Sequence, residues 1–402
     1  MVVPSCRALH RTSTTLRGRL FFCPPSTASK QWRFSSHNAP SVQESVHPIS
    51  PEVDQLDRYL GHLARSLSHQ QGASLTELYR QYEEEAGTVI KRVVPYEERP
   101  SAKRRADVTT ADQYAAGDGI VLVVHAQFDE AAHRLSKTTV CTGFVVNSGA
   151  DNHMQGDTII TCAHTLDEMY QHFRRTITQV EKPTRFFSFI VPSSGKPRII
   201  TQLLSSMPRS DVIALEARSL APAVKLRSLP LSPFPVYSGT PVLTHLFGSN
   251  DPPVVQHSIA RTKATTKILN STTIEEPIQW LENNAWRRWG VGQMLGYRSY
   301  TGVEIEAGIS SVLPHILTSI LPTPGSSGGP LVHAETGTVV GMTSGRRMDN
   351  RVEGERGWGC SAESIFEVIH GIFATNGLKA NSVQMFSLPG FTPNNHNKHP
   401  HP

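Results

Sequence analysis

Short β-rich runs separated by turn residues follow one another from residue 120 to residue 361, and this pattern restricts the fold more than any other feature. Many short strands at such spacing are typical of antiparallel barrels and sandwiches. The chain also holds 29 Gly and 28 Pro, which suits a turn-rich, all-β architecture. We predict strands over residues 120–125, 141–147, 158–161, 186–191, 199–204 and 212–215, and after Pro230 over 241–246, 303–307, 330–332, 338–343 and 357–361.

Helical patterns occur before, within and after the β-rich region. Residues 50–95 predict a helical extension, because Ser50 can cap a helix that starts with Pro51, and apolar residues then recur every three or four positions. This stripe fits a helix packed on the main fold and also a short oligomerising coiled coil, so the oligomeric state stays open. Residues 270–296 predict a helical insertion that serves packing or shapes a substrate cleft or partner site, and residues 363–374 predict a C-terminal helix.

The two ends of the chain differ in composition from the rest. Residues 1–40 hold six basic side chains and no acidic one, a composition typical of a mitochondrial transit peptide. We therefore predict a targeting presequence over residues 1–36, with processing near Ser35 or Ser36; a disordered basic tail and a chloroplast leader have the same composition. Residues 376–402 predict a disordered tail, since the stretch from Asn394 to Pro402 has nothing apolar to bury.

Charge and cysteine content argue against several classes of protein. The net charge of +5 comes from the basic leader and the remainder is near neutral, so nucleic acid is not an expected partner. Two of the five cysteines lie in the leader, and Cys141, Cys162 and Cys360 form no CxxC pair, which predicts neither a disulfide framework nor a metal site. We expect no cofactor. No apolar run approaches the about 18 residues that a membrane span requires.

The segment 325–331, with the sequence GSSGGPL, carries the candidate nucleophile Ser327. Glycines around this serine leave room for the backbone of a substrate to approach. The amides of Gly325 and Ser327 can point at one oxygen, which makes an oxyanion hole for acyl transfer. A Gly/Ser linker has a similar composition, but the apolar residues after Pro330 predict a buried strand and argue against a linker.

A serine hydroxyl is a weak nucleophile and needs a base, for which His164 is the candidate. This histidine follows an apolar strand that begins at Ile159. Asp211 precedes another apolar run and can orient the imidazole and stabilise its charged form. A lone histidine at a strand end is usually structural. The order His, Asp, Ser along the chain, however, differs from the orders in subtilisins and α/β-hydrolases, and the three residues together predict a catalytic triad.

These three motifs resemble those of the trypsin/chymotrypsin superfamily, and in detail those of its HtrA/Deg branch. The sequences SDVIAL at 210–215, GSSGGPL at 325–331, VVGM at 339–342 and TGFVV at 142–146 carry the resemblance, which covers about residues 118–375. It implies two antiparallel six-stranded β-barrels, over residues 112–225 and 226–375, with the triad between them. It also implies a serine endopeptidase that acts on polypeptide substrates.

Several positions depart from this family pattern. Thr165 stands where secreted trypsins have a disulfide cysteine, so the usual bridge to the Cys141 region is not expected. Ser326 stands where secreted zymogens have an acid that captures a new N-terminus, so activation by N-terminal insertion is not expected. The residues after position 375 are too few for the PDZ domain that the HtrA branch normally carries, and residues 247–310 match no known part of the family.

By the same resemblance, Leu321 forms the floor of the pocket for the residue before the scissile bond. Thr343, Ser344 and Gly345 form the opposite wall, where the substrate strand pairs with their backbone. Leu321 carries no charge, so we expect cleavage after Val, Leu or Ala. Arg346 is expected either to narrow the entrance or to attract an acidic residue elsewhere in the substrate.

Two other functions share parts of this pattern. A catalytically inactive protease fold can serve as a binding module, but all three triad residues are present here. An esterase would use the same acyl-transfer chemistry, but the chain order of the triad and the lack of a G-x-S-x-G elbow argue against it.

Overall fold

The computed structural model of the 402-residue chain divides into two compact units, Met1–Ile49 and Ser50–Pro402. The structure describes residues 51–67, 72–90, 96–102, 104–106, 119–129, 134–147, 156–176, 184–219, 226–247, 287–299, 301–307, 315–350 and 352–370, all of which belong to the second unit. The predicted presequence and the predicted disordered tail lie outside the described residues.

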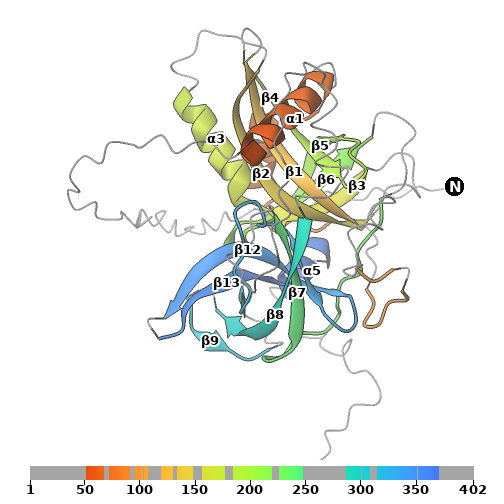
Figure 1. Ribbon diagram of the computed structural model, residues 1–402, viewed down its shortest axis with the longest axis vertical. Helices are drawn as coiled ribbons and strands as arrows, with labels where there is room; N and C mark the ends of the chain where they lie inside the picture. Colours follow the sequence, from red (N-terminus) through yellow and green to blue (C-terminus); the bar gives the residue numbers. More distant parts are fainter. Residues whose placement is uncertain are drawn as a thin grey trace, which may run out of the picture. The chain divides into compact units, whose positions relative to one another are not determined.

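Six antiparallel strands in the first half of the β-rich region close into a barrel in the order β1-β2-β3-β6-β5-β4 (Figure 1). The strands are β1 (Ile120–Asp129), β2 (Arg134–Asn147), β3 (Asp157–Cys162), β4 (Thr184–Pro192), β5 (Arg198–Met207) and β6 (Val212–Arg218). Each contains one of the six strands that the sequence predicts before residue 225, so this half of the fold is confirmed.

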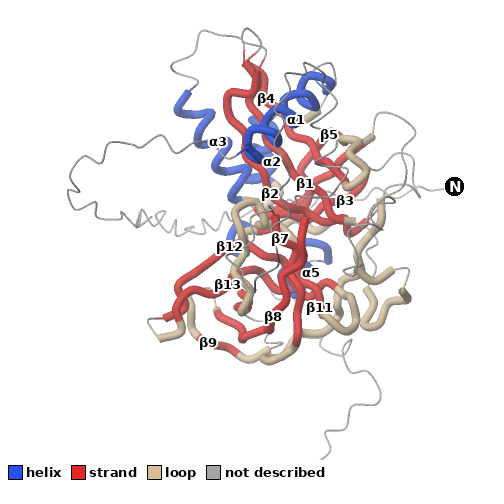
Figure 2. Tube along the Cα trace, viewed as in Figure 1, coloured by secondary structure: helices blue, strands red, loops and turns tan. Residues whose placement is uncertain are grey.

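A second antiparallel barrel follows, in the order β10-β13-β12-β11-β7-β8, and the pairing of β10 with β8 closes it (Figure 2). A two-residue strand, β9 (Glu304–Ile305), adds to β8 outside this ring. The ring consists of β7 (Pro241–Phe247), β8 (Arg287–Arg298), β10 (His315–Thr318), β11 (Pro330–His333), β12 (Val339–Asn350) and β13 (Gly354–Ser361). Two antiparallel six-stranded barrels are the predicted fold class.

Strand β1 is apolar at nearly every position because both of its faces are buried. Val121 and Val123 belong to the main core cluster, whereas Leu122 and Val124 belong to a second cluster that the helix α1 (Pro51–Leu67) covers. An antiparallel strand with one wet face would alternate apolar and polar residues instead. The apolar stripe of α1 is thus buried within its own chain, which favours a packed extension over a coiled coil.

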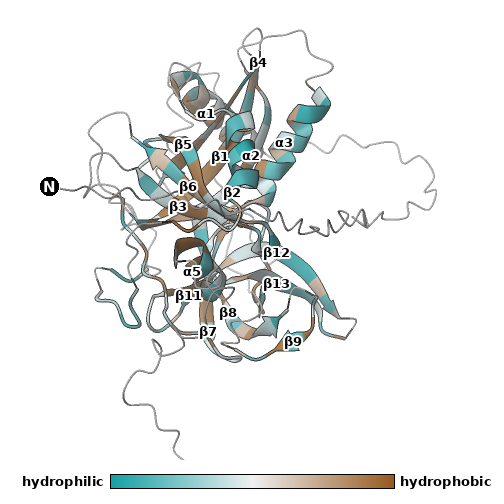
Figure 3. Ribbon diagram, turned by 180° about the vertical axis from the view of Figure 1, so that it is seen from behind, coloured by the Kyte–Doolittle hydropathy of each residue, from teal (hydrophilic) through white to brown (hydrophobic). Residues whose placement is uncertain are grey.

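A second N-terminal helix and the last described helix complete the packing. Helix α2 (Leu75–Glu84) starts at Ser74, whose side chain accepts a hydrogen bond from the amide of Glu77, and it buries Leu75 and Leu78 in the main core. Helix α5 (Ala362–His370) is mostly hydrophobic (Figure 3) and confirms the predicted C-terminal helix as far as residue 370. Among the described residues, no helix is long and apolar enough to cross a membrane.

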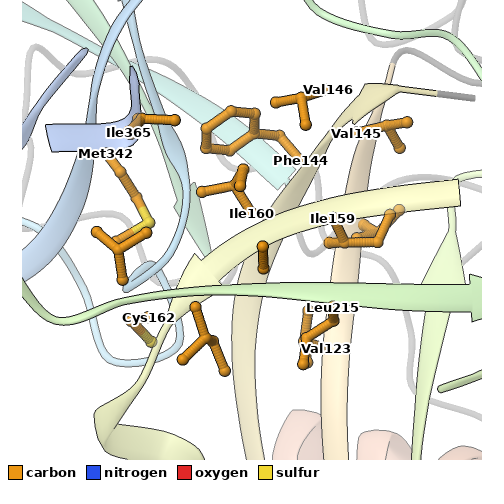
Figure 4. Packing of buried hydrophobic residues seen from close by; sticks show 14 of the residues in the cluster. Val123, Phe144, Val145, Val146, Ile159, Ile160, Cys162, Leu215, Met342 and Ile365 are labelled. Carbon is orange, nitrogen blue, oxygen red and sulfur yellow. The ribbon is translucent and has the colours of Figure 1, made fainter. Parts of the chain in front are cut away.

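One hydrophobic core joins the two barrels. Phe144 and Ile160 from the first barrel lie in the same buried cluster as Met342 from β12 and Ile365 from α5 (Figure 4). Because these side chains exclude water from the junction, they fix the loops of one barrel against those of the other. The residues of the site described below lie on these loops.

The prediction of a helix over residues 270–296 is wrong for its last part, because Arg287–Arg298 form strand β8; residues 270–286 lie outside the described residues. Gly290 and Gly292 explain the difference. A Cβ at Gly290 would lie 2.8 Å from the side chain of Ile320, so this face of β8 has room only for hydrogen. Two glycines separated by a single residue also disfavour a helix.

Smaller differences concern four other segments. The strand predicted over residues 303–307 is only the two-residue β9, and residues 315–318, for which no strand was predicted, form β10. The chain after β3 forms the helix α3 (His164–Thr176), which the sequence reasoning did not identify. Residues 85–90 of the predicted helical extension are not helical.

Candidate active site

The side chains of Asp211 and His164 are joined by a hydrogen bond. Strand β3 ends at Cys162, and His164 begins α3, while Asp211 follows a short 3-10 turn, Pro208–Ser210. The Asp211 Oδ2 atom lies 2.7 Å from Nδ1 of His164, and Oδ1 accepts the amides of Ala163 and His164 at 3.0 and 2.9 Å. A carboxylate held in this way keeps the proton on Nδ1 and leaves Nε2 as an acceptor.

The backbone of Asp211 has an unusual conformation that suits this role. Its φ of 58° places it in the left-handed region, and it is the one non-glycine residue with positive φ in the described part of the chain. Aspartate and asparagine enter this region more readily than other residues. The backbone thus turns sharply between β5 and β6 and presents the carboxylate to the start of α3.

The electrostatic setting of His164 favours its protonated form. Burial disfavours a charged ring, but the hydrogen bond and the negative charge of Asp211 outweigh burial and raise the pKa of His164 above its usual value. A histidine in this state accepts a proton readily near neutral pH, which is the property a general base requires.

Ser327 lies in a tight turn between two glycines whose φ values are positive, Gly325 at 85° and Gly328 at 84°. Its hydroxyl donates to the main-chain carbonyl of Ser344 at 3.0 Å. Within the described part of the chain, no hydrogen bond joins Ser327 to His164; Nε2 of His164 instead lies 3.8 Å from Sγ of Cys162. The structure therefore brings Asp211 and His164 together but leaves the hydroxyl of Ser327 on a different acceptor.

The turn of Ser327 is attached to the first barrel by Thr142 of β2. The amide of Thr142 donates to the carbonyl of Ser327 at 2.8 Å, and its hydroxyl donates to the carbonyl of Gly325, also at 2.8 Å. A Cβ on Gly328 would overlap the carbonyl oxygen of Thr142, so only glycine fits there. Sequence reasoning placed Thr142 in a family motif but missed this contact.

Ser326 stabilises the same turn through hydrogen bonds of its side chain. Its side chain is fully buried, accepts the amide of Phe247 at 2.8 Å and bonds the hydroxyl of Thr323 at 2.7 Å. The sequence reasoning identified Ser326 only as a departure from the acid of secreted zymogens. Its hydrogen bonds show that this loop is held by neutral groups that are present before any processing.

Two amides of the turn remain available to a ligand. The amides of Ser326, Gly328 and Gly329 donate to backbone carbonyls of the chain, whereas those of Gly325 and Ser327 donate to no acceptor in the described residues. Backbone amides without an internal partner at such a turn can stabilise a developing oxyanion. They are the two amides that the sequence predicts for this purpose.

The residues predicted to line the pocket belong to two segments, one with Leu321 and one with Thr343, Ser344 and Gly345. Thr343 is buried and bonds the hydroxyl of Thr244 at 2.8 Å, and Gly345 faces open space. Leu321 is 43% exposed. Between these two segments runs the side chain of Arg346, whose Nε donates to the carbonyl of Pro322 at 2.7 Å.

The three described cysteines, Cys141, Cys162 and Cys360, are buried and free. The hydroxyl of Thr165 lies 3.2 Å from Sγ of Cys141 and 3.8 Å from Sγ of Cys162, so the two thiols share one neighbour behind His164. Among the residues that the structure describes, no cluster of His, Cys, Asp or Glu could hold a metal ion.

Two closed six-stranded antiparallel barrels, with a His–Asp pair on one and a glycine-flanked serine turn on the other, define a chymotrypsin-like fold. Residues 141–342, half of the chain, match the family model of the trypsin-like peptidase domain. The chain therefore belongs to the family of trypsin-like peptidase domains, which confirms the resemblance at that level. No curated protein matches it by sequence.

Similar solved structures include two of one mycobacterial protein. An inactive form of Rv3671c from M. tuberculosis H37Rv, a serine-to-alanine mutant, has a TM-score of 0.36 and 16% identity, over 70% of this chain and 98% of that one. An inactive form of the Rv3671c protease has a TM-score of 0.36 and 15% identity, over 68% of this chain and 97% of that one.

Proposed function

We propose that the protein is a serine endopeptidase that hydrolyses peptide bonds through an acyl-enzyme on Ser327. His164 acts as general base and then as general acid, and Asp211 orients it. The amides of Gly325 and Ser327 stabilise the tetrahedral oxyanion. The observation that carries this proposal is the 2.7 Å contact between Nδ1 of His164 and Asp211, which prepares Nε2 to accept a proton.

The first step requires a change at Ser327. Its hydroxyl must leave the carbonyl of Ser344 and turn to Nε2 of His164. Catalytic hydrogen bonds are often absent or long before the substrate binds. A substrate strand that adds to β12 would donate its own amide to a carbonyl of this wall and so compete with Ser327 for its acceptor.

Because the Ser327 hydroxyl donates to Ser344 and not to His164, the structure also fits one alternative, a protease-fold binding module without activity. A fluorophosphonate probe distinguishes the two, because it forms a bond only with an activated serine. We expect the intact protein to be labelled at Ser327, as identified by mass spectrometry of the labelled peptide, and to cleave a peptide library. Ser327→Ala should lose both signals and keep its fold; a wild-type protein that is never labelled would support the binding module.

We further propose that the protein works in mitochondria, in protein processing or quality control. The acid-free basic composition of residues 1–36 supports this proposal. N-terminal mass spectrometry of the native protein tests it, with an expected start near Ser35 or Ser36 and co-fractionation with mitochondria. A cytosolic protein that starts at Met1 or Val2 would contradict the proposal.

A further inference from the structure

The side chain of Arg346 extends from β12 to the segment that contains Pro322, close to the turn of Ser327. Ser344, two residues earlier on β12, accepts the Ser327 hydroxyl at 3.0 Å, and Pro322, five residues before Ser327, accepts Nε of Arg346 at 2.7 Å. The guanidinium therefore connects the two chain segments that lie on either side of the proposed nucleophile. The main chain of Ser344 and the residue Arg346 are two positions apart on β12, a separation of about 7 Å that is within the reach of one substrate residue.

The charge of Arg346 has no acidic partner among the residues that the structure describes. Arg298, by contrast, pairs with Asp349 at 3.2 Å, and Arg347 lies over the ring of Trp358 at 4.3 Å from its centre. Arg346 is exposed, and its one hydrogen bond within the described part of the chain uses Nε. The two terminal nitrogens, which form the fork that binds a carboxylate, are thus available to a ligand.

The backbone beside Arg346 is open to a substrate strand. One edge of β12 pairs with β13, where Gly345 lies opposite Trp358 and Arg346 opposite Gly357. On the other edge, β11 pairs with β12 as far as Met342, and the backbone of Thr343 bonds Gly328 and Gly329 of the turn before β11, so the unpaired edge begins at Ser344. A peptide that adds a strand to this free edge, with its scissile carbonyl at Ser327, places the side chain of the preceding residue between β12 and the segment that contains Pro322.

The wall beneath this position leaves little depth for a large apolar side chain. A Cβ on Gly357 would overlap the main-chain carbonyl of Ile320, so the segment before Leu321 packs directly on β13. Leu321 itself is 43% exposed rather than buried as the floor of a deep pocket would be. The side chain before the scissile bond therefore meets the guanidinium of Arg346 before it meets Leu321.

We propose that Arg346 determines specificity and selects substrates with Glu or Asp immediately before the scissile bond. This inference rests on the proposed peptidase function and replaces the aliphatic preference that the sequence predicts from Leu321. A carboxylate can take two parallel hydrogen bonds from the terminal nitrogens, whereas the amide of Gln offers one acceptor and no charge. Lys and Arg at this position are repelled by a like charge.

The test compares matched peptides that differ only in Glu or Gln before the scissile bond. We expect wild-type kcat/KM to favour Glu by about 10-fold or more, the effect of one charge-assisted hydrogen-bonded pair. Arg346→Gln should reduce the ratio to near one, and Arg346→Glu should favour Lys over Gln. Arg347→Gln is the control, because its side chain lies over Trp358, and it should keep the wild-type ratio.

Each variant is also labelled with a fluorophosphonate probe. The probe has no residue before its reactive centre, so it reports the reactivity of Ser327 independently of Arg346. A labelled, active wild type with a Glu-to-Gln ratio of one or less would overturn the role of Arg346 and leave the peptidase proposal standing. A preference for Glu that persists in Arg346→Gln would do the same. A wild type that is neither labelled nor active would overturn the peptidase proposal and this inference together.

Discussion

The hydroxyl of Ser327 donates to the main-chain carbonyl of Ser344, 3.0 Å away, and not to the ring of His164. The two residues belong to the turn before β11 and to the free part of β12, so the acceptor of the proposed nucleophile lies on the wall that a substrate strand would occupy. Substrate binding and release of the hydroxyl are thus coupled through one carbonyl oxygen. This coupling predicts that a probe with a peptide segment labels Ser327 faster than a small probe does, by more than its tighter binding alone explains.

The first prediction concerns Asp211. Asp211→Asn should keep the fold, because asparagine also tolerates the left-handed backbone at φ 58°, but it should lower kcat by about 10⁴. The amide would favour the wrong tautomer of His164. Steady-state kinetics measure the loss. Asp349→Asn is a matched control, since it weakens an ion pair with Arg298 that includes none of the proposed catalytic residues, and it should leave kcat largely unchanged.

The second prediction is a pH profile. Peptide hydrolysis needs the neutral ring of His164, and Asp211 raises its pKa above 6.5 against the opposing effect of burial. The acid limb of kcat/KM should therefore lie above pH 6.5, and in Asp211→Asn the limb of the residual activity should move to lower pH. If the acid limb of kcat/KM stays at the same pH in Asp211→Asn, a group other than His164 controls that limb.

The same shift has a consequence for stability. Because folding raises the pKa of His164, its pairing with Asp211 stabilises the protein fully below about pH 6.5, and this contribution is lost as pH rises through the folded value. Denaturant unfolding of the wild type and of Asp211→Asn at acid and alkaline pH should differ most on the acid side.

The strands of the first barrel could be predicted because each is a short apolar run between turn residues. Strand β8 could not, because residues 270–296 read as helical in the sequence, and the lack of room for a side chain at Gly290 and Gly292 appears only when Ile320 packs on them. A four-residue strand such as β10 carries too few residues for a periodic signal.

In the site, too, short sequence motifs could be predicted, whereas contacts between segments that are distant in the sequence could not. His164, Asp211 and Ser327 stand in motifs that a sequence displays. The hydroxyl direction of Ser327, the anchoring of its turn by Thr142 and the bond from Arg346 to Pro322 depend on segments that are distant in the sequence and meet only after folding. These contacts were therefore beyond the reach of motif analysis.

The third prediction concerns the N-terminal extension. Helix α2 packs on β5, which leads to Asp211, and the hydroxyl of Tyr79 on α2 donates to Asp167 of α3 at 3.2 Å, three residues after His164. Leu78 is fully buried on this helix, so Leu78→Ala should cost about 2–5 kcal/mol of unfolding free energy and lower kcat. Arg80→Ala, on the exposed face, should change little, because water screens its ion pairs. Equal denaturation midpoints for the two variants would contradict the packing role.

The last prediction isolates the contact between Gly328 and Thr142. Gly328 and Gly239 have nearly the same backbone, with φ of 84° and 85°, so an alanine at either position carries the same left-handed strain of about 1–2 kcal/mol. At Gly239 the new methyl group meets nothing within 4 Å, whereas at Gly328 it overlaps the carbonyl oxygen of Thr142 and the hydroxyl of Thr161. Gly328→Ala should therefore lose about 1–3 kcal/mol more of the free energy of unfolding than Gly239→Ala, as measured by denaturant unfolding.

Gly328→Ala should also lose fluorophosphonate labelling, because the turn of Ser327 must move away from the first barrel to make room. Gly239→Ala should keep wild-type labelling. If the two variants were equally stable and equally reactive, the serine turn would not be held against Thr142, and the attachment of the second barrel to the first through this contact would be refuted.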